Sequence, residues 1–210
     1  MEKTQIVPSV IMKHAPKITK TVSESRLALK GAFHDTDGSI TVTNSHYLWR
    51  VENAHAYPSP IIIDPVTMAQ IEGNYPATKR LIPAFSEAKA VGEIALDKRT
   101  RDIIKALREA GRFETDGTKK KENVILKIHD GVFTTMPKAL IQAKAELMKF
   151  DNPGVKLYIN ATYLLNTLEW LADELGERAT VPFCYYGEMR PVLIGLDRAK
   201  AIIMPVRVNE

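Results

Sequence analysis

From residue 92 onward, the apolar residues alternate between the period of a strand and the period of a helix. The order is a strand, a helix at 98–112, two strands, a further strand, a strand at 155–159, a helix at 162–175 and three closing strands. Residues 1–60 contain another unit of this kind. This order predicts an α+β fold of antiparallel sheets with the helices on one face, built from βαβββ-type repeats.

The N-terminal part combines one helical segment with two predicted strands. Residues 10–22 have a helical pattern in which Pro16 must start a turn or cause a kink. Strands are predicted at 26–33 and 40–51, because Asp35-Thr36-Asp37-Gly38 between them is typical of a hairpin turn.

The C-terminal part contains the two clearest helices. Gly111 is a stop signal for the helix at 98–112, and Asn160 is the predicted N-cap of the helix at 162–175. The predicted buried face of the first helix consists of Ile103, Ile104, Leu107 and Gly111, and that of the second of Leu164, Leu168, Leu171 and Leu175.

Prolines and glycines between residues 74 and 92 indicate a domain boundary. We therefore predict a shortened N-terminal domain at 1–73, a linker and the start of the second domain at 74–91, and a complete C-terminal domain at 92–210.

The last ten residues, 201–210, have the pattern of a buried strand that runs almost to the C-terminus and carries a Met-Pro-Val-Arg step. Pro205 cannot donate a hydrogen bond to a neighbouring strand, so it belongs on a sheet edge or at a strand end. Unpaired backbone and the exposed Met204 and Val206 beside it would form a place that receives a peptide.

Basic residues are concentrated on the helix at 98–112. The net charge of +4 and the pI near 9.0 permit nucleic-acid binding without demanding it. A solvated helix face is the alternative interpretation, and the run Lys119-Lys120-Lys121 lies in a predicted loop and is interpreted as solvated. The candidate DNA-binding residues are Lys98, Arg101, Lys105, Arg108 and Arg112, and less densely Lys13, Lys17 and Lys20.

The motifs of several function classes are absent from the sequence. It has no glycine-rich phosphate loop, its five histidines have no metal-ligand spacing, and Cys184 in an apolar strand is interpreted as a core residue. No clustered carboxylates point to a nuclease. We therefore expect no enzyme activity, no cofactor and no metal. Without an apolar span, a signal peptide or a possible disulfide, we expect a cytoplasmic protein with no membrane contact.

Four segments, in order, resemble the bacterial beta sliding clamp, the processivity factor of DNA polymerase III. They are Leu29-Lys30-Gly31-Ala32-Phe33 with Val42-Thr43-Asn44-Ser45-His46-Tyr47-Leu48; Glu72-Gly73-Asn74-Tyr75-Pro76 with Lys79-Arg80-Leu81-Ile82-Pro83; Tyr158-Ile159-Asn160 with Tyr163-Leu164-Leu165; and Ile202-Ile203-Met204-Pro205-Val206-Arg207-Val208. Such a chain is shorter than a typical three-domain clamp, which suggests a phage or mobile-element type of relative.

The resemblance implies a DNA-clamp fold without catalytic activity, which encircles or contacts duplex DNA and recruits a DNA polymerase and clamp-loader-type proteins. Asn44-Ser45 and Tyr47 replace the family's Asp-Gly and Arg, which implies a changed peptide preference or a lost site. The resemblance also implies an apolar pocket that binds partner peptides. The alternative is that the apolar residues of this set simply form core contacts between two domains. Carried over by position, the pocket would consist of Leu29, Thr43, Ser45, His46, Leu48, Pro76, Arg80, Leu81, Ile202, Met204, Val206 and Arg207.

The resemblance also implies a closed ring of several copies. With two domains per chain, three copies would give a ring of six domains, and with one and a half domains per chain, four copies would. Such a ring needs head-to-tail contacts that close. The competing hypothesis is a clamp-fold interaction module, or decoy, that binds replication proteins without encircling DNA.

Overall fold

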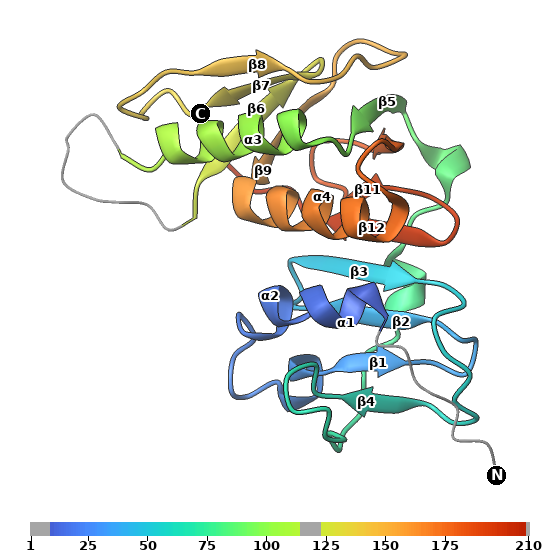
Figure 1. Cartoon of the computed structure of the whole chain (residues 1–210). Helices are drawn as coiled ribbons and strands as arrows, with labels where there is room; N and C mark the ends of the chain where they lie inside the picture. The colour runs from blue at the N-terminus through green and yellow to red at the C-terminus, as the bar shows by residue number, and fades with distance from the viewer. Residues whose placement is uncertain (1–8, 114–122, 209–210) are drawn as a thin grey trace. The chain divides into compact units, whose positions relative to one another are not determined.

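The computed structural model describes residues 9–113 and 123–208, which form parts of two compact units at 1–77 (unit 1) and 78–210 (unit 2). Both units combine helices with antiparallel sheets (Figure 1), so the predicted α+β class is confirmed. The lysine run at 119–121 and the last two residues lie outside the described ranges.

Unit 1 is one four-stranded antiparallel sheet with a broken helix. The sheet order is β4-β1-β2-β3, and the second helical piece packs against β2. Pro16 begins that second piece, as expected for a proline at a helix start. The elements are α1 (Val10–His14), α2 (Pro16–Thr19), the 3₁₀ helix η1 (Leu27–Lys30), β1 (Ala32–His34), β2 (Ile40–Thr43), β3 (Tyr47–Val51) and β4 (Ile61–Ile63).

Two strand predictions in unit 1 are wrong. The segment 26–33 is mostly η1, since Leu29 N–H bonds back to Arg26 O, and only β1 is extended. The segment 40–51 is two strands, because the Asn44 side chain accepts hydrogen bonds from the backbone at positions 46 and 47 and Ser45 has a φ of 76°. The predicted turn at 35–38 is confirmed, with Gly38 at a φ of 81°.

Unit 2 has two four-stranded antiparallel sheets, β8-β7-β6-β9 and β12-β11-β10-β5. Its elements are η2 (Thr78–Leu81), η3 (Phe85–Glu87), β5 (Ala90–Ala95), α3 (Lys98–Ala110), β6 (Ile125–His129), β7 (Val132–Thr135), β8 (Lys144–Glu146), β9 (Lys156–Asn160), α4 (Ala161–Leu175), β10 (Thr180–Tyr185), β11 (Val192–Ile194) and β12 (Ala199–Ile203).

The two long helices of unit 2 lie side by side (Figure 1) and each covers sheet strands. Helix α3 contacts β6 and β7, while α4 contacts β9 and β12. The N-cap prediction for α4 is confirmed, since Asn160 accepts hydrogen bonds from the N–H groups of Thr162 and Tyr163. Leu175 was wrongly placed on the buried face, because it is the last residue of α4 and lies exposed before Gly176.

Candidate nucleic-acid interface and peptide-binding residues

Helix α3 is anchored by its cap and by its apolar side. The Asp97 side chain accepts a hydrogen bond from Thr100 N–H at 2.7 Å, and the hydrogen bonds from Thr100 hold the pKa of Asp97 below its usual value. Ile104 and Leu107 are buried on the opposite side from the solvent. The geometry therefore leaves a row of charged residues exposed: Lys98, Arg99, Asp102, Lys105 and Glu109.

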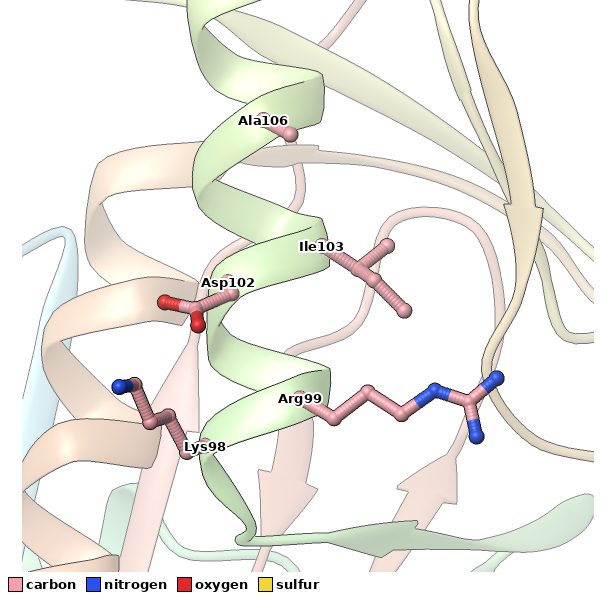
Figure 2. Close-up of a pocket in the computed structure, with 5 residues that line it drawn as sticks. All are labelled: Lys98, Arg99, Asp102, Ile103 and Ala106. Carbon is pink, nitrogen blue, oxygen red and sulfur yellow. The ribbon is translucent and has the colours of Figure 1, made fainter.

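A shallow depression of about 590 Å³ runs along this exposed face, lined by Lys98, Arg99, Asp102, Ile103 and Ala106. Figure 2 shows Arg99 and Ile103 projecting from one side of the helix and Lys98 and Asp102 from the other. The prediction that Ile103 is buried is wrong, because it is only half-buried and lines this depression. Two cations against one carboxylate leave the depression net positive.

Three of the five basic residues predicted on the helix at 98–112 are engaged in ion pairs, and one of these, Arg112, lies beyond the end of α3. The Arg101 guanidinium pairs with Glu177 and its side chain is only 15% exposed. Both Arg108 and Arg112 pair with Glu109, at 3.1 and 3.2 Å. Lys98 and Lys105 are exposed. The exposed cations of α3 are therefore these two lysines and Arg99, which the sequence prediction had not included.

The basic residues of unit 1 lie on and directly after its broken helix. Lys13 and Lys20 are exposed, whereas Lys17 is half-buried. The Lys17 carbonyl accepts a hydrogen bond from the Tyr47 hydroxyl at 3.2 Å, which fastens α2 to β3. The structure thus holds this helical segment firmly on its sheet and exposes two of its three lysines.

Four of the predicted peptide-binding residues come together in the β2–β3 hairpin of unit 1. Thr43 Oγ1 donates to the Tyr47 carbonyl at 2.8 Å and accepts from Ser45 N–H at 3.1 Å. Arg26 donates to the Ser45 hydroxyl at 2.9 Å. His46 is exposed and Leu48 is buried. The other two predicted residues of unit 1 lie elsewhere: Leu29 is buried on η1, and Pro76 is exposed.

The C-terminal segment is not the long strand that was predicted. Strand β12 ends at Ile203, and Pro205, two residues later, cannot donate to a ladder. Val206 N–H donates to the Tyr158 carbonyl at 2.8 Å, so the segment after β12 is fixed to the edge strand β9. Ile202 is buried, while Met204 is 40% exposed and available for contact.

The remaining predicted residues of unit 2 are exposed to solvent. Arg80 and Leu81 lie on η2, and the large apolar side chain of Leu81 is 52% exposed. Arg207 follows the Val206 anchor and is exposed as well. Within unit 2, the structure therefore presents an exposed apolar side chain on each of two segments, η2 and the C-terminal segment.

The described residues contain no cluster of three or more histidine, cysteine or acidic residues that could hold a metal ion. Cys184 is fully buried, and burial raises the pKa of its thiol to about 11, so it stays protonated as a core residue. Within the described ranges, every helix is too short or too polar to cross a membrane.

Comparisons by sequence find no matching protein-family model and no matching curated protein. Comparison of the structure finds the beta subunit from DNA polymerase of Streptococcus pyogenes, with a TM-score of 0.72, 15% identity and coverage of 95% of this chain and 64% of that one. The DNA polymerase III beta chain from Streptococcus pneumoniae matches with a TM-score of 0.66 and 21% identity, covering 94% of this chain and 63% of that one.

The DNA polymerase III subunit beta from Borrelia burgdorferi, solved in complex with a natural product, matches with a TM-score of 0.69 and 14% identity over 95% of this chain and 62% of that one. The chain therefore has the fold of the bacterial beta sliding clamps and spans about 64% of their length. The resemblance noted in four short segments is confirmed at the level of the fold.

Proposed function

We propose that this chain is a non-catalytic, sliding-clamp-like processivity factor of the cytoplasm. It holds duplex DNA without regard to sequence, as a homo-oligomeric ring, and recruits a DNA polymerase and clamp-loader-type proteins. The observation that supports the proposal is the likeness of nearly the whole chain to the clamp fold.

Contact with DNA would be made by the exposed cations of α3, namely Lys98, Arg99 and Lys105. Long, flexible side chains on an exposed helix face can meet phosphates loosely, which suits a protein that must slide. The depression beside Arg99 and Ile103 offers no enclosed pocket that would bind a single base. In unit 1, Lys13 and Lys20 would add to this electrostatic attraction.

Recruitment of partners would use the apolar residues beside the C-terminal segment. Met204 is 40% exposed, and the hydrogen bond of Val206 to β9 holds the backbone next to it in place. Such a fixed segment with an adaptable side chain suits the binding of short apolar peptides. In unit 1, the hairpin residues Thr43, Ser45 and His46 are proposed as further peptide-binding residues.

The DNA-binding part is tested by fluorescence anisotropy with two unrelated duplexes of equal length at low salt. We expect equal affinities for both duplexes, which fall together as the salt concentration rises. A strong preference for one sequence, or no binding at low salt, would contradict the proposal.

A second candidate is a clamp-fold interaction module that does not encircle DNA. Ion pairs on α3 and directly after it favour it, because Arg101 pairs with Glu177 while Arg108 and Arg112 share Glu109. This candidate predicts peptide binding that is lost in Met204→Ala, together with no retention on circular DNA.

A further inference from the structure

The sheet β8-β7-β6-β9 of unit 2 is covered by helices on one of its two faces. Helix α3 contacts β6 and β7, and α4 contacts β9. Side chains alternate between the two faces of a strand, and Leu126, Phe133 and Leu157 are buried on the covered face. The residues that alternate with these form the opposite face, which we call the outer face: Ile125, Lys127, His129, Val132, Thr134, Lys144, Glu146, Lys156 and Tyr158.

The strand register places two lysines and a tyrosine in one row across the outer face. Lys127 lies opposite Tyr158 on one side and opposite Thr134 on the other. Thr134 in turn lies opposite Lys144 on the next strand. Because neighbouring strands lie about 4.8 Å apart, the backbones of Lys127 and Lys144 are about 10 Å from each other. The row therefore carries two separate positive charges and one aromatic ring.

The next row adds a third lysine and a second ring. His129 lies opposite Lys156 on one side and opposite Val132 on the other, and Val132 lies opposite Glu146. The His129 side chain is 62% exposed, and its Nε2 lies 3.9 Å from the carboxylate of Asp130 in the adjacent turn. Glu146 is the acidic residue of the two rows and lies on the edge strand β8. The two rows thus hold three lysines against one carboxylate.

Tyr158 is held in place between its strand neighbours and lies close to two of the lysines. The Nζ atoms of Lys127 and Lys156 are 6.0 and 5.9 Å from the centre of its ring. A cation at this distance is attracted to the ring. The Tyr158 carbonyl also accepts the hydrogen bond from Val206 N–H at 2.8 Å, which fixes the backbone of β9 at this residue. The outer face therefore presents a positioned aromatic ring with two ammonium groups beside it.

Rings and lysines on an uncovered sheet face are the groups that bind single-stranded nucleic acid. Unpaired bases stack on aromatic side chains, histidine included, and basic side chains attract the phosphates. Four-stranded sheets present such rings to RNA in common RNA-binding domains. A duplex keeps its base faces stacked inside, and an acidic peptide would need the lysines alone. The combination of rings and lysines therefore favours a single strand over both.

We propose that the outer face of this sheet binds single-stranded nucleic acid. Bases stack on Tyr158 and His129, and phosphates contact Lys127, Lys144 and Lys156. Helix α3 lies on the other face of the sheet, so this site is separate from the residues proposed for duplex DNA. The proposal therefore does not depend on duplex binding or on encirclement.

Fluorescence anisotropy of the full chain with a labelled oligothymidylate of about 12 nucleotides tests the stacking. Tyr158→Leu removes the ring and keeps the charge, so we expect it to weaken binding at least about fivefold at low salt while duplex binding stays unchanged. The matched control is Tyr163→Leu, which changes a half-buried tyrosine on α4 and should leave both affinities unchanged. Equal affinity of the wild type and Tyr158→Leu for the oligonucleotide, or an equal loss in the control, would overturn the proposal.

The contribution of the lysines is measured by the salt dependence of the same binding. Each phosphate contact with a single strand contributes about 0.7 to the slope of log affinity against log salt concentration, so Lys127→Gln/Lys156→Gln should lower the slope by about 1.4. A polyglutamate peptide of equal charge should displace the labelled strand far less readily than unlabelled oligothymidylate. An unchanged slope, or equal displacement by polyglutamate, would contradict a site for single strands.

Photo-cross-linking of the wild type gives a test that does not depend on how the variants fold. The oligonucleotide carries 5-iodouracil in place of thymine, and the cross-linked residues are identified by mass spectrometry of the digested protein. We expect cross-links at Tyr158 or His129, because a stacked base lies directly against the ring. Cross-links confined to α3, or none on the outer face, would overturn the proposal.

Discussion

Removing the exposed cations of α3 should weaken DNA binding in a way that the salt dependence measures. The perturbation is the triple variant Lys98→Gln/Arg99→Gln/Lys105→Gln, which keeps the length of these exposed side chains roughly and removes their charge. Each phosphate contact contributes about 0.9 to the slope of log affinity against log salt concentration. Three lost contacts therefore lower the slope by about 2.7.

This change in slope corresponds to a large difference in affinity across an ordinary salt range. Between about 50 and 200 mM salt, the wild type should lose about 40-fold more affinity than the triple variant. The assay is fluorescence anisotropy with a labelled duplex at several salt concentrations. The matched control is Arg101→Gln, because the Arg101 charge is already paired with Glu177 and its side chain is only 15% exposed. An unchanged slope in the triple variant, or an equal loss in the control, would refute the reasoning.

Three further predictions concern stability and partner binding. Burial lowers the pKa of His34 to about 4, so its share of the unfolding free energy is complete above its unfolded pKa near 6.5 and is lost as the pH falls toward 4. Urea unfolding should show that the free energy of unfolding falls by about 3 kcal/mol between pH 6.5 and pH 4 in the wild type, and that this fall is absent in His34→Phe. An equal fall in both proteins would contradict the prediction. Asn160→Ala should lower the unfolding free energy by about 1 kcal/mol relative to Asn160→Asp, which keeps the cap of α4, and equal stabilities would show that the cap contributes nothing. Met204→Ala should weaken the binding of a polymerase-derived clamp-binding peptide at least about tenfold, as measured by calorimetry, because the exposed Met204 side chain would contact the peptide. The free energy of unfolding should change by no more than about 0.5 kcal/mol. Unchanged peptide affinity would show that Met204 is not part of the site.

Local signals in the sequence were sufficient for the long helices, for the cap of α4 and for the turn at 35–38. The helix at 98–110 follows from its apolar period and from Gly111 at its end. The α4 cap follows from Asn160, and the turn at 35–38 from its Asp and Gly residues. These features depend on side chains that are close in sequence, and the residues alone therefore predict them.

The predictions failed where a segment of the sequence is compatible with more than one local conformation. The strand-forming residues on both sides of positions 44–46 led to the prediction of one continuous strand. A turn is formed there instead, and it is stabilised by hydrogen bonds to the Asn44 side chain. The segment after β12 was extended too far, because an apolar pattern does not show where ladder partners end. The hydrogen bond from Val206 to Tyr158 that holds this segment joins residues far apart in the chain.

The candidate interface was only partly predictable for the same reason. A helical period placed Lys98 and Lys105 on the exposed face, and the structure agrees. It could not show that Arg101 is neutralised by Glu177, which lies 76 residues away. Arg99 was not among the predicted residues, although it is exposed directly after Lys98.

Retention on DNA circles tests the proposed encirclement most directly. The protein is bound to a closed circular duplex and passed through a sizing column at a salt concentration that removes non-specific contacts, and the same duplex linearised by one cut serves as the control. A sliding clamp, loaded by its own opening or by a loader, stays on the circle and runs off the linear DNA. Equal retention on both DNAs, or loss from both in the presence of a loader, would contradict the account.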